Sequence, residues 1–160
     1  MAEIKQKSGN NGQDITITLA SLANAAARQS SVIDNTGNNF IDVLVSLIIK
    51  APASSTSATG YVNVYVFGSN DGGTNYSENA GASDAAITLV SPTNLRLLGQ
   101  INIVANGVTY KSSLMSVAAA FGGTMPDKWG IVVQNNTGGT LDTTESNHIK
   151  KYQGFTSQVV

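Results

Sequence analysis

The sequence predicts an all-β domain: a single antiparallel sandwich, of the jelly-roll type, with about eight to ten strands. Three observations predict this fold. Apolar and polar residues alternate with a period of two over several short stretches. Turn signals of Gly, Asn, Pro and Ser recur about every 8–12 residues. No stretch carries a convincing helical pattern. Roughly 145 residues after a polar start suit an eight-stranded jelly roll better than an immunoglobulin sandwich of about 100 residues.

Composition narrows the classes of function. The chain has 160 residues, no cysteine, 12% charged residues and a net charge of −1. Disulfides and thiolate metal sites are therefore excluded. Nucleic-acid binding is not expected, because no basic stripe is present to neutralise phosphates. No apolar run approaches the ~20 residues of a membrane helix. The polar residues are mostly Asn, Thr, Ser, Gly and Gln, a neutral surface that favours packing against other protein.

The chain divides into a polar start and one domain. Residues 1–13 predict a flexible arm, which is either disordered or becomes ordered on a neighbouring molecule. The sandwich domain spans residues 14–160. Its first stretch, "DITITLA", places Ile15, Ile17 and Leu19 on one face. The Ala-rich segment that follows predicts one weak helical turn at most.

The strongest strand is "FIDVLVSLIIK", which directs one unbroken apolar row to the core. The row consists of Ile41, Val43, Val45, Leu47 and Ile49. Asp42 interrupts the opposite row, so we expect it to accept hydrogen bonds or to pair with Arg96 or Arg28. The loop "APASSTSATG" at residues 51–60 is expected to be exposed and mobile.

The next strand, "YVNVYVFGS", is apolar on both faces, although a sheet in a small domain usually buries one. Val62, Val64 and Val66 suit the core. Tyr61, Tyr65 and Phe67 point the other way, and we expect this aromatic row to form a self-association surface, since tyrosine buries area and keeps a hydroxyl for a partner. The alternative is that the aromatic row faces the core and the valines lie under a loop.

Further turns and strands follow. "NDGGTN" and Asn106–Gly107 both predict β-hairpins, because Asp-Gly, Gly-Gly and Asn-Gly supply the positive φ of primed turns. "LRLLGQINIV" is expected to point Leu95, Leu97, Ile101 and Ile103 inward. "AAAFGGTMPD" is a loop or short helix. "KWGIVVQNN" places Trp129, Ile131 and Val133 on one face, and "IKKYQGFTSQVV" is the last strand.

No stretch carries a catalytic or metal-binding signature, and we predict no enzyme activity, cofactor or metal. His148, the single histidine, is expected in an exposed loop rather than as a catalytic base. Asp71 belongs to a hairpin turn rather than a calcium site, which would need several more carboxylates. Trp129 is expected in the core or at an interface, and Trp129 and Tyr152 are possible partner contacts. Trp129 with Tyr61, Tyr65 or Tyr152 could instead form a sugar-stacking platform.

The stretches "GSNDGGTNYS", "SPTNLRLLGQINI" and "FGGTMPDKWGIVVQNNTG" give the chain a resemblance to small virion proteins of tailed bacteriophages. The likeness runs over most of residues 14–160, and none of its motifs is a chemical signature. Within this group the chain most resembles capsid cement or decoration proteins with jelly-roll folds. Such proteins commonly sit as trimers at local threefold positions of the capsid.

The resemblance implies a structural protein that binds the outer face of the major capsid protein shell, and itself as a homotrimer. It would be located on the virion, after assembly in the host cytoplasm. The arm 1–13 and the loops 51–60 and 122–127 would make contacts. The alternatives are a structural role in the phage tail, neck or baseplate, and a carbohydrate-binding or receptor-binding module.

Overall fold

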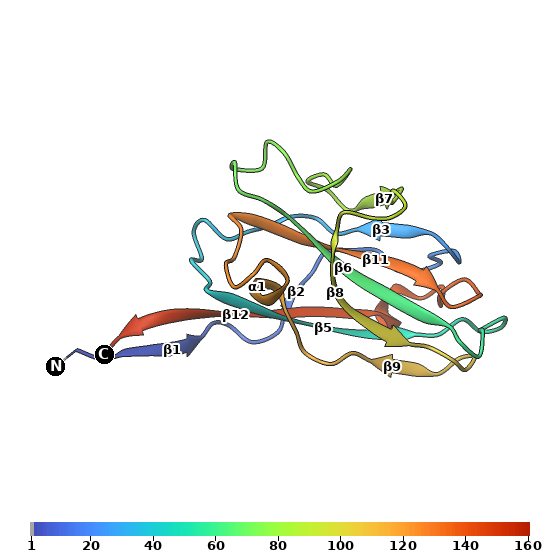
Figure 1. The fold of residues 1–160 in the computed structure, drawn as a ribbon. Coiled ribbons are helices and arrows are strands. Elements are labelled where there is room, and N and C mark those ends of the chain that lie inside the picture. The colour runs from blue at the N-terminus through green and yellow to red at the C-terminus, as the bar shows by residue number, and fades with distance from the viewer. Residues whose placement is uncertain (1) are drawn as a thin grey trace.

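Two antiparallel β-sheets packed face to face make up the structure, a computed structural model that describes residues 2–160 (Figure 1). Sheet A contains β1 (Ile4–Ser8), β2 (Gln13–Asp14), β5 (Asp42–Lys50), β9 (Thr109–Lys111), β10 (Met115–Ser116) and β12 (Ile149–Val159). Sheet B contains β3 (Ala27–Gln29), β4 (Ile33–Asp34), β6 (Tyr61–Ser69), β7 (Ala85–Ile87), β8 (Arg96–Asn102) and β11 (Lys128–Asn136). A short helix, α1 (Val117–Ala120), and a 3-10 turn, Glu145–Asn147, complete the elements.

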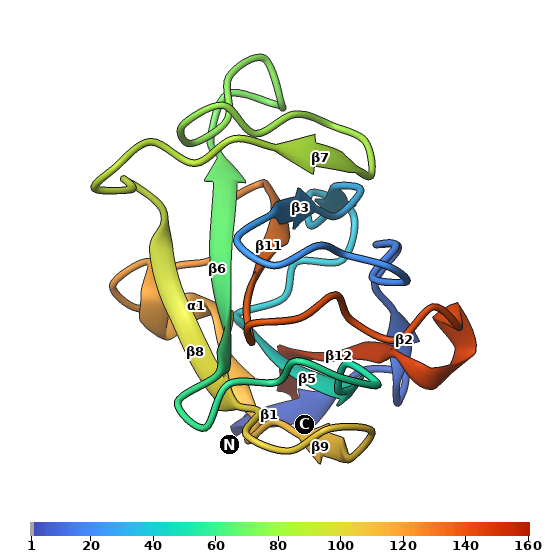
Figure 2. The same ribbon diagram turned by 90° about the vertical axis from the view of Figure 1, so that its right-hand side faces the viewer.

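The strand order confirms the predicted all-β sandwich and is consistent with a jelly roll. In sheet A, β12 lies between β2 and β5, and β5 pairs with β9 and β10 on its other side. In sheet B, β11 lies between β3 and β6, and β6 pairs with β8. Most neighbours are therefore distant in sequence, as they are in two interleaved Greek keys. Figure 2 shows the two layers after a quarter turn.

The main core lies between the two sheets, where the predicted alternation holds. On β5 the buried residues are Val43, Val45, Leu47 and Ile49, and on β6 they are Val62, Val64 and Val66. Ile15, Ile17 and Leu19 are also buried, and the N–H of Ile15 donates to the carbonyl of Lys150 at 3.0 Å. Ile41 departs from the prediction. It lies before the start of β5 and is exposed.

A second, smaller core lies on the outer face of sheet B. The segment between β6 and β8 folds back over this face in Figure 1. The buried residues of this second core are Ala27, Phe67, Ile87, Leu95 and Val132. Phe67 packs edge to face on Tyr76, with ring centroids 5.9 Å apart. It also lies over Gly130, where a Cβ atom would come within 2.4 Å of the phenyl ring. The apolar surplus at this end of β6 is thus covered by the chain itself.

Both predicted hairpins are wrong, although both turns exist. β6 does not pair with β7, which pairs with β3, and β8 does not pair with β9, which pairs with β5. The turn at Asn106–Gly107 therefore carries the chain from one sheet to the other. Its Gly107 has φ +64°, as the turn signal implied. Turn residues specify a local reversal, but not which strands pair across it.

The prediction for the stretch around β8 fails on one side of a β-bulge, at Leu95, which lies in the second core on the outer face of sheet B, and at Leu97. The register with β6 shifts between Val64 and Tyr65. Leu97, expected inward, consequently faces outward and is exposed, whereas Ile101 beyond the bulge is buried. A bulge places one extra residue in a strand and inverts the alternation on its far side.

The start of the chain differs from the predicted flexible arm. β1 pairs with the C-terminal part of β12, from Ile4 opposite Val159 to Ser8 opposite Phe155. This two-stranded ribbon projects from the sandwich (Figure 1), and its outermost backbone pair joins Glu3 to Val160. Every residue of β1 is exposed. We call this element, residues 4–8 and 155–159, the terminal ribbon.

Candidate functional site

The predicted self-association row is divided by the structure. Phe67 is fully buried in the second core, so it does not belong to the surface, and its inclusion in that row was wrong. Tyr61 and Tyr65 are half-buried on the outer face of sheet B. The Tyr65 hydroxyl accepts a hydrogen bond from Asn63 Nδ2 at 3.0 Å, and Gln100 Nε2 donates to Asn63 Oδ1 at 3.1 Å. This end of β6 therefore presents a neutral surface of tyrosines and amides.

Trp129 and Tyr152 lie in the main core. Trp129 is fully buried, so it is neither a partner contact nor a sugar platform in this fold. Tyr152 is half-buried and packs perpendicular to Trp129, with centroids 5.4 Å apart. Among residues 2–160 the indole N–H has no hydrogen-bond partner, so the burial of this donor costs free energy. Burial also raises the pKa of Tyr152. The pair holds the two sheets together.

The outer face of sheet A carries apolar side chains that this chain does not cover. Ile48 and Ile149 are direct cross-strand partners, and Ile149 is 42% exposed. Leu44 lies on the same side of β5 as Ile48, four residues earlier in the sequence. Leu114 precedes the buried Met115, so it points to the same outer side, and it is 68% exposed. Phe155, half-buried, continues the face toward the terminal ribbon. We use "outer face of sheet A" for Leu44, Ile48, Leu114, Ile149 and Phe155.

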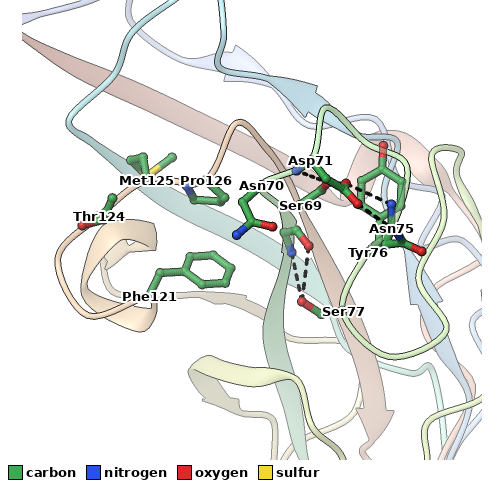
Figure 3. Close-up of a pocket in the computed structure, with 11 residues that line it drawn as sticks. Ser69, Asn70, Asp71, Asn75, Tyr76, Ser77, Phe121, Thr124, Met125 and Pro126 are labelled. Atoms are coloured by element: carbon green, nitrogen blue, oxygen red, sulfur yellow. Dashed lines mark hydrogen bonds between the residues drawn. The ribbon is translucent and has the colours of Figure 1, made fainter.

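A pocket of about 500 Å³ lies at the end of the sandwich from which the terminal ribbon projects. It is formed between the loop after β6 and the loop after α1 (Figure 3). One wall is apolar and consists of Phe121, Met125 and Pro126; Asn70 and Ser77 line the other. The floor requires Gly68, because a Cβ atom there would lie 2.9 Å from Pro126. The 122–127 loop, predicted as a contact element, forms part of this pocket.

Asp71 organises one side of the pocket. Its Oδ1 accepts hydrogen bonds from Ser69 Oγ at 2.6 Å and from the N–H groups of Thr74 and Asn75. Its Oδ2 accepts one from Asn75 Nδ2 at 2.8 Å. The Ser69 hydroxyl and these other donors lower the pKa of Asp71 well below its ordinary value. The carboxylate therefore stabilises the turn in which it lies, as the sequence predicted for this residue, although the turn does not close a hairpin.

His148 is buried, contrary to the expectation of an exposed loop. Its Nδ1 accepts from the backbone N–H of Lys50 at 3.4 Å, and its Nε2 lies 3.0 Å from the carbonyl of Asp142. A carbonyl can only accept, so Nε2 carries the proton. Both ring nitrogens are engaged with backbone, and the imidazole ties β5 to the loop before β12.

Two carboxylates accept hydrogen bonds from segments that are distant in the sequence. Asp42 accepts from Ser116 Oγ at 2.8 Å and from the N–H of Ala118 at 3.0 Å, which confirms its predicted role as an acceptor. Arg28 pairs with Asp84 instead. Glu145 accepts from the N–H groups of Leu19 and Ala20 at 2.8 and 2.7 Å, and from Lys150. Burial raises the pKa of Glu145, but these donors outweigh burial and lower it overall.

The surface that sequence reasoning missed is the outer face of sheet A. Its signal was present, since Leu44 and Ile48 interrupt the polar side of β5, but only the pairing of Ile48 with Ile149 shows that the residues converge.

Across residues 2–160 no helix is long and apolar enough to cross a membrane, and no group of three His, Asp or Glu residues could hold a metal. No protein-family model matches the chain, and no curated protein sequence is detectably similar to it.

Proposed function

We propose that this protein is a non-catalytic structural protein of a tailed-phage virion, a decoration or cement protein that binds the outer surface of the major capsid shell. The observation that carries the proposal is the outer face of sheet A. A solvated sheet face is normally polar. Here it presents Ile149 and Leu114 to solvent beside Ile48. The resemblance of the sequence to phage virion proteins supplies the setting.

The size of this face indicates how the protein would bind. β5 has nine residues, and the strands beside β5 and β12 are much shorter, so a face four strands wide measures at most about 30 by 19 Å, or roughly 570 Å². A stable interface usually buries about 800 Å² on each partner. One copy would thus bind weakly, and several copies held together would bind much more tightly, because simultaneous engagement multiplies affinity. This arithmetic favours a multimer, and the resemblance makes it a trimer in the proposal.

The half-buried Tyr61 and Tyr65 remain the proposed self-association residues. They lie on sheet B, on the opposite side of the sandwich from the outer face of sheet A. A protein that uses one sheet for its own copies and the other for the shell can do both at once. The carbohydrate-binding alternative loses its tryptophan platform, because Trp129 is buried.

The test is co-sedimentation with capsid shells assembled from the major capsid protein encoded nearest to this gene. We expect saturable binding of the wild-type chain, and binding weakened by roughly tenfold or more for Ile149→Lys, because an apolar contact worth about 1.5–3 kcal/mol is replaced by a charge. Val90→Lys is the matched control: Val90 is 44% exposed but lies in the segment over sheet B. A chain that stays in the supernatant, or that sediments with tails, contradicts the proposal.

A further inference from the structure

The terminal ribbon has an open edge whose composition selects a particular partner. Glu3 and Val160 exchange two backbone hydrogen bonds of 2.9 Å, and the N–H of Gly9 donates to Gly154 at 2.8 Å. Hydrogen-bonded and non-bonded pairs alternate along an antiparallel ladder. Between these two positions, Lys5 and Lys7 therefore also direct their backbone groups toward β12.

The N–H and C=O groups of Ile4, Gln6 and Ser8 consequently point to the other side of β1. In the part of the chain that the structure describes, no strand pairs with that side. A solitary two-stranded ribbon is marginally stable, and an unpaired edge is a template for a further strand. The side chains also leave an apolar tip, since Ile4 and its cross-strand partner Val159 are 77% and 67% exposed.

We propose that the outer edge of β1 pairs antiparallel with the same edge of a second copy of this chain, about a twofold axis at Ile4. In this register Ile4 lies opposite Ile4 of the second copy, and the two residues exchange both backbone hydrogen bonds. Glu3 then lies opposite Lys5 of the second copy, and the symmetry gives two such pairs. The apolar row becomes continuous across the four strands, from one Val159 through both Ile4 side chains to the other Val159.

Charge distinguishes this register from its neighbours. An axis at Lys5 places Lys5 opposite Lys5, a repulsion that offsets part of the gain from its two Glu3–Lys7 pairs. An axis at Gln6 places Lys5 opposite Lys7 twice, whereas the axis at Ile4 has two Glu3–Lys5 pairs and no pair of like charges. Like charges directly opposite each other on a sheet destabilise the pairing. Glu3 and Lys5 already interact within one chain at 3.2 Å, so the second copy extends an existing alternation of charge. Lysines on an edge usually prevent pairing, but here Glu3 makes the edge complementary to itself.

The sharpest test exploits the absence of cysteine from the sequence. Ile4→Cys introduces a single thiol at the proposed axis, where hydrogen-bonded partners have Cα atoms about 5.5 Å apart, a distance that a disulfide spans. Gln6→Cys is the matched control, because Gln6 faces residue 2 of the second copy and lies four positions from its own counterpart. Under mild oxidation we expect a disulfide-linked dimer from Ile4→Cys and monomeric chains from Gln6→Cys.

A second pair of variants tests the edge without a new bond. Gln6→Pro removes an N–H that points outward and leaves the pairing with β12 intact, whereas Gln6→Ala keeps that N–H. In sedimentation velocity the Gln6→Ala assembly should have at least twice the mass of the Gln6→Pro assembly. Glu3→Lys should weaken association by roughly three- to thirtyfold, since two cross-strand pairs become repulsive. The double variant Glu3→Lys, Lys5→Glu should restore it.

Equal masses for Gln6→Pro and Gln6→Ala would overturn the proposal, and so would cross-linking of Gln6→Cys in preference to Ile4→Cys. An edge that binds a strand of another protein would give these same negative results in purified samples. The terminal ribbon and the outer face of sheet A are tested by different variants. Loss of shell binding by Ile149→Lys leaves this proposal untouched, and loss of pairing by Gln6→Pro leaves the proposed docking to a shell untouched.

Discussion

Phe67→Ala tests whether the second core belongs to the chain itself. Phe67 is fully buried, and its neighbours Ile87, Leu95 and Val132 belong to the same chain. The floor beneath the ring is the backbone of β11 at Gly130, which pairs with Phe67 of β6, while β3 and β4 pair with neighbouring residues of β11 on its other side. The residues that cover the ring, which include Tyr76, belong to a segment without regular secondary structure, and we expect them to fill only part of the cavity that the substitution leaves.

We therefore expect this substitution to lower the free energy of unfolding by about 3–4 kcal/mol, toward the lower end of the range for Phe→Ala in cores. For a domain of this size each kcal/mol corresponds to about 2–4 °C, so the melting temperature should fall by roughly 6–16 °C. Urea unfolding followed by circular dichroism measures the first quantity. Tyr61→Ala, at the open end of the same strand, is the control and should cost about 1 kcal/mol or less.

The reasoning would be refuted if Phe67→Ala left the unfolding free energy within about 0.5 kcal/mol of the wild type. It would be refuted equally if the loss of stability appeared only at protein concentrations at which the wild type associates. That result would place Phe67 at a contact between subunits. The predicted loss is independent of concentration.

Two further substitutions test local packing and electrostatics. Gly154→Ala should destabilise by about 1–3 kcal/mol, because its Cβ atom would lie 2.4 Å from the ring of Phe40; Gly37→Ala, with nothing within 4 Å, is the control in the same urea titration. Glu145→Gln should cost about 1–2 kcal/mol at pH 7, since the carboxylate accepts two backbone N–H groups and Lys150. The pKa of Glu145 is lowered from 4.5 in the folded chain, so its stabilisation is present above pH 4.5 and is lost as the pH falls through the folded pKa. Unfolding free energies of the two chains should thus converge as the pH falls through the folded pKa of Glu145; a constant difference would show that the charge has no role.

The alternation of side chains predicted the main core well. Val43 to Ile49 on β5, and Trp129, Ile131 and Val133 on β11, are all buried where a period of two places them. Each strand carries this information in its own residues. The departures arise where a partner decides the outcome, as at Leu97, whose orientation is set by a bulge that only the pairing with β6 reveals.

The pairing of the strands could not be predicted from local sequence, because it too depends on residues that are distant in the chain. The Asn106–Gly107 turn is as favourable for a crossing between sheets as for a hairpin, and the contacts of β9 with β5 decide between them. Phe67 and His148 show the same limit. The exposure of both side chains was predicted from the residues next to them in the sequence. In the structure Phe67 is covered by a segment that folds back over sheet B, and His148 is enclosed between β5 and the loop near Asp142.

Only part of the candidate surfaces could be predicted from the sequence. Tyr61 and Tyr65 were identified on their strand, whereas the outer face of sheet A required three separate segments to be placed side by side, namely β5, β12 and the residues at the start of β10. The terminal ribbon required residues 4–8 and 155–159 to meet, at opposite ends of the chain.

Hydroxyl-radical footprinting of the chain, free and bound to capsid shells, tests the central claim most directly. Leu114 and Ile149 are open to oxidation in the free chain, at 68% and 42% exposure. If the outer face of sheet A docks on the shell, oxidation of both side chains should fall several-fold on binding, while that of Val90 stays unchanged. Protection of Val90 together with undiminished oxidation of Leu114 and Ile149 would contradict the account.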